Sequence, residues 1–450
     1  MNQQTDIDVA RELSQAKLGR MHKWLGVMMA SLTLFDGYDT FNPAYVIHFV
    51  VGPWGLSPQQ SGMLISSGLV GFLIGAALHG LVADRFGRRV TLLGGLWITS
   101  IFTLATPLFG HSFVSFCAVR VLTGIGLGVL LPLATTYINE LAPQRTANKF
   151  SLWGVALGWA LGGTLAGVVG VYLTPKFGWQ VLYWLGATSF VLTFVLHKYL
   201  PESVRFLALK GRTEEIRTVL SRLIPERADV YRNARLILPP APAQQASLGA
   251  LFKPGLRRKT FTIWTAAFLS LFAIFGLTGW IPTVMMKRGE TFAASFGFGA
   301  LMQVMSFVGG LVCAHIADKR ASSRGVLAAW WLMGGAAVLT LVLLNGHAVN
   351  LACVAFAGFF VIGAQFVLNN FTASSYGTGE RATGVGMMLS VGRVGAILGP
   401  FVAGTLQSVY GNPDIMFLVI AAASSVAGAA IFSLGRADVG RHDVRGVLAH

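Results

Sequence analysis

Charge is scarce in this sequence. Asp, Glu, Lys and Arg make up 12% of the 450 residues, and 54% of the residues are hydrophobic. Soluble globular proteins carry about 25% charged residues. A chain of this composition cannot cover a water-facing surface, so we expect a polytopic membrane protein.

Cysteine is rare as well. Cys117, Cys313 and Cys353 are widely spaced within apolar runs, which favours buried thiols over a disulfide framework or a metal site. The sequence shows no nucleophile and base grouping, no metal-ligand cluster and no phosphate-cradling loop on a soluble domain. We therefore expect neither an enzyme nor a cofactor. Residues 1–23 are polar and contain no removable signal peptide, so the first span should serve as the insertion signal.

Apolar sequence is abundant, and it predicts an all-α membrane protein. Twelve runs are long enough to cross a bilayer, which takes about 20 residues. They cover residues 24–50, 58–82, 90–110, 112–139, 147–173, 178–199, 260–286, 294–317, 326–346, 349–375, 382–410 and 413–434. The predicted organisation is an N-terminal tail (1–23), a six-helix bundle (24–199), a linker (200–259), a second six-helix bundle (260–434) and a C-terminal tail (435–450).

The linker is the only long polar stretch. Its basic residues interleave with Glu214 and Glu215 as they would on a surface helix, and the proline-rich stretch 239–242 then breaks the pattern. We expect a cytoplasmic connection that contains one short amphipathic helix.

The basic residues lie mostly on one face. Of the 34 Lys and Arg residues, 29 fall in the two tails or beside the loops that follow the even-numbered spans. The opposite face holds Lys176, Lys287 and Arg288, and Arg120 and Arg393 lie inside spans. The positive-inside rule then places both termini in the cytoplasm. This distribution explains the formal net charge of +16 without a nucleic-acid partner.

The two halves of the sequence resemble each other. Asp84 at the end of the second span aligns with Asp318 at the end of the eighth. The fifth and eleventh spans share glycine spacings of four and five residues, at Gly158, Gly162 and Gly167 and at Gly395, Gly399 and Gly404. Such duplication points to two bundles that rock about a central site.

Two acids occupy the first span. Asp36 and Asp39 are three residues apart, so they point to the same side of a helix. They lie ~18–22 Å along the span from Trp24, near the middle of the bilayer, where one ionisable group costs ~2.5–3.5 kcal/mol to insert. One interpretation is a structural ion pair with a basic residue. The other, which we prefer, is a proton or substrate site that faces a water-filled cavity.

Several motifs resemble those of the major facilitator superfamily. They are the Gly-x-x-x-Asp-Arg-x-Gly-Arg-Arg run at residues 80–89, Arg120 followed by Gly124, Gly126 and Gly128, and the run Pro-Glu-Ser-Val-Arg-Phe at 201–206. Within that superfamily, the run Asp-Gly-Tyr-Asp-Thr at 36–40, Gly392-Arg393-x-Gly395 and Gly399-Pro400 resemble the aromatic acid:proton symporters. Asn42-Pro43 departs from this pattern and predicts a kink beside the acids.

The candidate site residues fall into three groups. Asp36 and Asp39 are the candidates for proton coupling. Arg393 and Arg120 are the candidates for binding an organic anion, because guanidinium meets a carboxylate with two parallel hydrogen bonds; structural pairing with an Asp is the alternative for both. Further candidates for substrate contact are the amides of Gln365 and Asn369 and the rings of Tyr38 and Trp280, with interhelical bonding and packing as their alternatives.

The motif at residues 80–89 predicts a conformational latch. We expect Asp84 to pair with Arg88, and Glu140 to pair with Arg85. The latch residues are Gly80, Asp84, Arg85, Gly87, Arg88, Arg89 and Glu140.

These features favour a secondary transporter for an aromatic or related organic acid anion, coupled to inward proton flow by alternating access. The resemblance implies a monomer in the bacterial inner membrane. A sugar:proton symporter is the first alternative, because that family also carries Gly-Tyr-Asp-Thr in its first span, but its paired glutamines are missing from the seventh. A drug:proton exporter is the second, disfavoured by the buried arginines.

Overall fold

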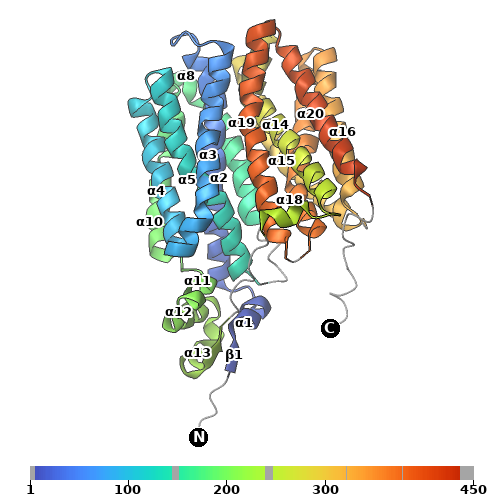
Figure 1. Ribbon diagram of the computed structural model, residues 1–450. Helices are drawn as coiled ribbons and strands as arrows, with labels where there is room; N and C mark the ends of the chain where they lie inside the picture. Colours follow the sequence, from blue (N-terminus) through green and yellow to red (C-terminus); the bar gives the residue numbers. More distant parts are fainter. Residues whose placement is uncertain (1–5, 144–151, 239–246, 321, 378, 436–450) are drawn as a thin grey trace.

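Two bundles of long helices stand side by side, and a small domain lies beneath the first one (Figure 1). The computed structural model describes residues 6–143, 152–238, 247–320, 322–377 and 379–435. Three parts of the predictions lie outside these residues. They are the proline-rich break at 239–242, the start of the fifth span at 147–151, and the C-terminal tail from 436 onward.

The first bundle corresponds to the first six predicted spans. Its segments are α2 (Arg20–Val50), α3 (Pro58–Phe86), α4 (Arg88–Phe109), α5 (Phe113–Leu141), the π-turn η1 (Leu152–Ala156) with α7 (Leu157–Tyr172), the short α8 (Thr174–Phe177), and α9 (Gln180–Gly186) with α10 (Ser189–Tyr199).

The second bundle follows the linker. It contains α14 (Arg257–Lys287), α15 (Phe292–Asp318), α16 (Arg324–Leu343), α17 (His347–Ala357) continued by the π-turn η4 (Gly358–Ile362) and α18 (Gly363–Ser375), α19 (Arg381–Tyr410) and α20 (Pro413–Ser433).

Eleven helical segments in the described ranges are long and apolar enough to cross a membrane. The first predicted span, α2, is 31 residues long but more polar, because it carries Asp36, Asp39 and Asn42 at its centre. The helices extend beyond the predicted spans: α2 begins at Arg20 rather than 24, and α3 continues to Phe86 rather than 82. Hydropathy marks the apolar part of a helix, whereas the backbone hydrogen bonding continues into polar sequence.

The glycines of the repeat lie at contacts between equivalent helices in the two bundles. Gly158 and Gly162 of α7 lie against the backbone of α2, and Gly395 and Gly399 of α19 lie against the backbone of α14. The third glycine of each set also reaches the other bundle, since Gly167 packs on Ala300 of α15 and Gly404 on Pro58 of α3. Small residues permit such close backbone approach between membrane helices.

The linker and the N-terminal tail form one small domain, which the sequence did not predict. The linker contains α11 (Val204–Leu209), α12 (Thr213–Leu223), η2 (Pro225–Arg227), α13 (Ala228–Asn233), β2 (Arg235–Ile237) and η3 (Leu248–Phe252) rather than a single short helix. The tail forms β1 (Asp6–Asp8), which pairs in parallel with β2, and α1 (Val9–Gln15). Glu12 of α1 accepts hydrogen bonds from Arg227 at 2.7 Å and from Tyr231 at 2.6 Å.

Each bundle has a half that is remote from the small domain, and we call these the far halves. The two bundles pack together in their far halves. There, Phe41 of α2 stacks near Phe275 of α14, with 6.4 Å between ring centroids. The indole N–H of Trp280 donates to the carbonyl of Pro400 in α19, which in turn lies against Gly62 of α3. Tyr45 of α2 contacts Phe296 of α15. The two bundles therefore meet mainly through rings and small residues.

We predict that Gly162→Ala destabilises the protein. A Cβ at this position would overlap the backbone carbonyl of Leu34, and overpacking of this kind costs about 1–3 kcal/mol. Gly94→Ala is the matched control, because a Cβ at Gly94 meets nothing within 4 Å and alanine is the better helix former. Thermal unfolding in detergent measures both variants. Equal midpoints for the two would contradict this account of the glycine repeat.

Candidate functional site

The acids of α2 have different surroundings. Asp39 is buried inside the first bundle and paired with Arg120 of α5, whose Nη1 donates to Oδ2 at 2.7 Å. Thr103 of α4 donates to the other carboxylate oxygen at 3.2 Å. The Arg120 guanidinium also lies over the ring of Tyr183 in α9, 5.6 Å from its centroid. Asp39 is therefore held by two other helices of its own bundle, and α9 supports its partner Arg120.

Pro43 contributes to this arrangement because it leaves one main-chain carbonyl of α2 without its helical hydrogen bond. It has no N–H to donate to the carbonyl four residues earlier, which belongs to Asp39. Nη2 of Arg120 donates to that carbonyl at 2.9 Å. The helix α2 nevertheless continues unbroken from Arg20 to Val50. The Asn42-Pro43 departure thus supplies a second acceptor for Arg120, rather than a break in the helix.

Asp36 has no such partner. Its side chain is 0% exposed, and neither carboxylate oxygen has a hydrogen-bond partner among the described residues. The opposite charge that acts on it is that of Arg393 in α19 of the other bundle. No ion pair within 4.0 Å joins the two in the described part of the chain. A buried polar group without a partner requires an explanation.

Arg393 lies at the seam between the bundles. Its guanidinium carbon is 3.9 Å from the ring centroid of Phe72 in α3. One turn along α19, the carbonyl of Ile397 accepts a hydrogen bond from Ser66 of α3 at 2.7 Å. The half-buried Arg393 therefore brings a positive charge from the second bundle onto an aromatic face of the first.

Aromatic and amide groups border the same seam. The ring of Phe41 makes an edge contact with Trp159 of α7, with centroids 4.9 Å apart. Gln303 of α15 is buried, and its Oε1 has no hydrogen-bond partner among the described residues. The space beside Gly163 is closed by Phe41 and by the Gln303 side chain. Rings and an unused amide oxygen thus lie together between the bundles.

The other predicted substrate residues are distributed more widely. The half-buried Gln365 of α18 accepts a hydrogen bond from Ser270 of α14 at 2.9 Å, and Asn369 is exposed one turn later. Tyr38 is buried in the first bundle and donates to the carbonyl of Leu182 at 2.9 Å. Trp280 uses its N–H on Pro400. The polar atoms of Tyr38 and Trp280 are therefore occupied by main-chain carbonyls.

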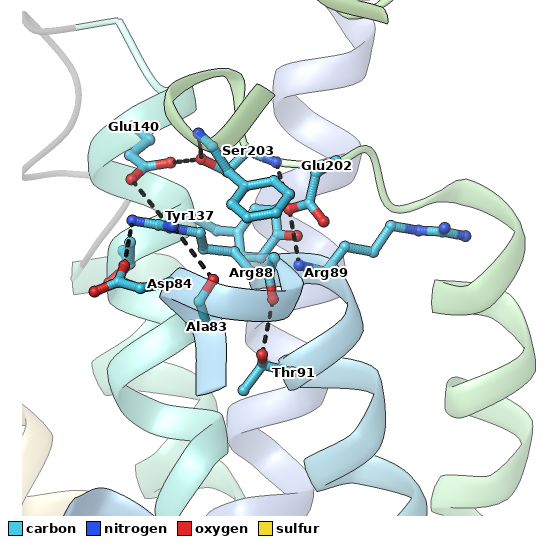
Figure 2. Close-up of polar contacts among 12 residues, drawn as sticks. Ala83, Asp84, Arg88, Arg89, Thr91, Tyr137, Glu140, Glu202 and Ser203 are labelled. Atoms are coloured by element: carbon cyan, nitrogen blue, oxygen red, sulfur yellow. Dashed lines mark hydrogen bonds and ion pairs between the residues drawn. The ribbon is translucent and has the colours of Figure 1, made fainter. Parts of the chain in front are cut away.

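The motif at residues 80–89 lies near the linker (Figure 2). Arg88 pairs with Asp84 at 3.1 Å, as predicted. Glu140 does not pair with Arg85, because Arg88 lies at 4.0 Å from it and Ser203 donates to it. Arg85 is exposed and lies over Phe86 instead. The prediction failed because Arg88 starts α4 and points toward α5, whereas Arg85 is on the exposed face of α3.

The start of the linker completes this cluster. Glu202 accepts from the backbone N–H of Arg89 at 2.9 Å (Figure 2) and from that of Ser203 at 2.8 Å. The guanidinium of Arg89 donates to the carbonyl of His197. Gly87 has φ of +104°, a conformation that favours glycine. In the described residues these contacts stay within the first bundle and the linker, and the role of this cluster as a conformational latch stays a prediction.

Sequence reasoning missed the residues that orient the charged groups. These are Thr103 beside Asp39, Tyr183 beside Arg120, Phe72 beneath Arg393, Ser270 beside Gln365, and Gln303 at the seam. The available signal was weak for each, because single hydroxyls and rings are common in membrane helices. A glutamine inside an apolar span, as at Gln303, was the strongest of these signals.

The chain matches the family model described as Major Facilitator Superfamily over residues 27–400. It is 30% identical to the 4-hydroxybenzoate transporter PcaK of Acinetobacter baylyi, covering 96% of this chain and 94% of that protein. It is 32% identical to the gallate transporter of Pseudomonas putida, covering 92% of each. It is 27% identical to the niacin transporter NiaP of A. baylyi, covering 97% of this chain and 98% of that one.

Solved structures share the fold. The partially occluded inward-open conformation of the xylose transporter XylE from E. coli superposes with a TM-score of 0.70 at 18% identity, covering 91% of this chain and 97% of that one. The prediction of twelve membrane helices in two related bundles is confirmed. With its family model, its relatives and its fold in agreement, the chain belongs to the Major Facilitator Superfamily and is a multi-pass membrane transporter.

Proposed function

We propose that this protein takes up an aromatic carboxylic acid together with protons by alternating access. The observation that carries the proposal is the buried Asp36, which has no hydrogen-bond partner among the described residues and faces the charge of Arg393 across the seam. A charged carboxylate in such a place is much more costly to bury than its protonated form. Asp36 is therefore the proton carrier in this proposal, and Asp39 is a fixed partner of Arg120.

The substrate anion would bind at Arg393. Guanidinium can hold a carboxylate with two parallel hydrogen bonds, and Arg393 makes no ion pair within 4.0 Å in the described part of the chain. Phe41, Trp159 and Phe275 supply ring contacts beside the seam. The named substrates of the relatives, 4-hydroxybenzoate and gallate, combine a carboxylate with one aromatic ring, which suits this set of groups.

The charge distribution supports an orientation in the membrane. The excess of Lys and Arg beside the linker and at the tails favours both termini in the cytoplasm of a bacterial cell. The bundles then meet on the outer side, through Phe41 with Phe275 and through Gly62 against the carbonyl of Pro400. We assign this arrangement to the inward-facing state of a monomer.

Uptake of a labelled panel tests the function. Cells that express the protein are given 4-hydroxybenzoate, benzoate, gallate, niacin or xylose, with and without a protonophore. We expect accumulation of one or more of the ring acids, and loss of that accumulation with the protonophore. Accumulation of xylose alone would indicate a sugar symporter, and export of the acids would contradict the proposed direction.

We predict that Asp36→Asn separates exchange from accumulation. The amide resembles the protonated acid, so the loaded carrier should still reorient, while proton-driven uphill transport is lost. Proteoliposomes under an imposed pH gradient measure accumulation, and counterflow measures exchange. Asp229→Asn is the control, because Asp229 is 91% exposed in the linker. Uphill accumulation by Asp36→Asn at the wild-type level would overturn the role of Asp36.

The two acids should also differ in their effect on stability. Asp39→Asn removes one partner of a buried ion pair, which costs about 3–5 kcal/mol, whereas Asp36→Asn breaks no hydrogen bond made within the described residues. The double variant Asp39→Asn with Arg120→Gln should recover part of the loss. Thermal unfolding in detergent measures all three. If Asp39→Asn and Asp36→Asn unfold at the same temperature, the structural assignment of Asp39 is wrong.

A further inference from the structure

A cavity of about 340 Å³ lies at the far end of the seam, away from Asp36 and Arg393. The first bundle lines it with the end of α2, the turn after it and the start of α3, including Ile47, His48 and Gly52. The second bundle lines it with α14 and α19, including Trp280. We call this cavity the outer vestibule. Ile47 is eleven residues beyond Asp36 in α2, a rise of about 16 Å, so the vestibule is separate from the central site.

The charged side chain that lines the outer vestibule is positive. Lys287 lines it and makes no ion pair within 4.0 Å in the part of the chain the structure describes, and no acidic residue is part of the lining. The adjacent Arg288 is different, since it pairs with Asp414 and donates to the carbonyl of Leu341 at 2.5 Å. Lys287 is therefore a cation available to an anion that enters from the far end.

Two unused polar groups line the same cavity. The amide of Gln407 is 97% buried, since the residue is 3% exposed, and neither Nε2 nor Oε1 has a hydrogen-bond partner among the described residues. The buried hydroxyl oxygen of Thr283 also has no hydrogen-bond partner among the described residues. An N–H donor and an O–H donor thus accompany the cation. Buried polar groups of this kind are normally satisfied by water or a ligand.

The remaining lining suits a ring. Ile47, Val51 and Trp280 supply apolar and aromatic surface. The volume lies near the lower end of the range for small-molecule sites, which is about 300–1,000 Å³. Such sites combine an apolar lining with a few placed polar groups. One aromatic ring with a carboxylate matches both features.

We propose that the outer vestibule is an entry site that holds the aromatic acid before the bundles open to admit it. The inference rests on the proposed function, because that function supplies the substrate class. The carboxylate lies near Lys287, the amide of Gln407 and the hydroxyl of Thr283 contact its oxygens, and the ring packs beside Trp280. The site raises the local concentration of the acid at the closed outer seam.

Gly52→Cys reports on occupancy. Gly52 lines the vestibule, and a Cβ there meets nothing within 4 Å. The three native cysteines are replaced by alanine, and intact cells are labelled with a membrane-impermeant maleimide in the presence of 4-hydroxybenzoate. We expect labelling to slow about fourfold at about three times the dissociation constant, where ~75% of the sites are filled. His111→Cys, in the exposed loop before α5, is the control and should be labelled at an unchanged rate.

Variants of the vestibule test the assigned groups. Lys287→Gln and Gln407→Leu should remove the protection, whereas Lys287→Arg should keep it. Lys287→Gln should also raise the KM for uptake several-fold while the maximal rate stays the same. Protection by sodium sulfate equal to that by 4-hydroxybenzoate would reduce the vestibule to a general anion site and overturn the proposal.

The central site is tested separately. Arg393→Gln, combined with Gly52→Cys, should abolish transport and keep the protection of the introduced thiol, which shows that the protecting acid is in the vestibule. Loss of protection in this combined variant would mean that the thiol only reports binding at the centre, and would overturn the entry site. A protein that takes up a ring acid but shows no protection refutes this inference alone, and one that takes up no ring acid refutes the proposed function.

Discussion

The free energy of burying charge is the constraint on which the rest of this structure depends. The protein places two carboxyl groups in the middle of α2, and the two groups have different surroundings. Asp39 receives a guanidinium, a threonine hydroxyl and the neighbourhood of a ring, all from its own bundle. Asp36 receives no hydrogen bond from the described residues. One acid is therefore paired inside its own bundle, and the other is the proton carrier of the proposed mechanism.

Helix geometry explains how neighbouring acids acquire such different roles. Three residues on an α-helix turn the side-chain direction by about 300°, which leaves a difference of about 60° between the two acids. That rotation is enough to place Asp39 in the core of the first bundle and Asp36 toward the charge of Arg393. Pro43 adds to the separation, because the carbonyl that it leaves free is the second acceptor for Arg120. The guanidinium is committed to Asp39 by both contacts.

Much of this could be predicted from the sequence. Apolar runs predicted the helices, and repeated glycines predicted the equivalence of the bundles. Residue spacing also predicts that Asp36, Asp39 and Arg393 lie near mid-depth in the bilayer, which stays a prediction. The pairing of each acid could not be predicted, because it depends on how α4, α5 and α9 pack around α2. The same holds for Glu140, which meets Arg88 rather than Arg85. Strand β1 pairs with a segment more than 200 residues later, and three residues of local pattern cannot specify such a partner.

The distribution of ion pairs explains how the bundles can separate. In the described residues, no ion pair within 4.0 Å joins one bundle to the other, whereas Arg120 and Asp39 pair inside the first and Arg288 and Asp414 inside the second. The seam is held by rings, by glycines against backbone, and by the hydrogen bond from Ser66 to the main-chain carbonyl of Ile397. Such contacts are short in range, so a small rotation breaks them together. Asp36 and Arg393 act across the same seam without touching. In the proposed mechanism, a proton on Asp36 cancels one charge of this couple and an anion on Arg393 cancels the other. Loading both then removes the attraction and leaves the packing contacts alone to decide which side is closed.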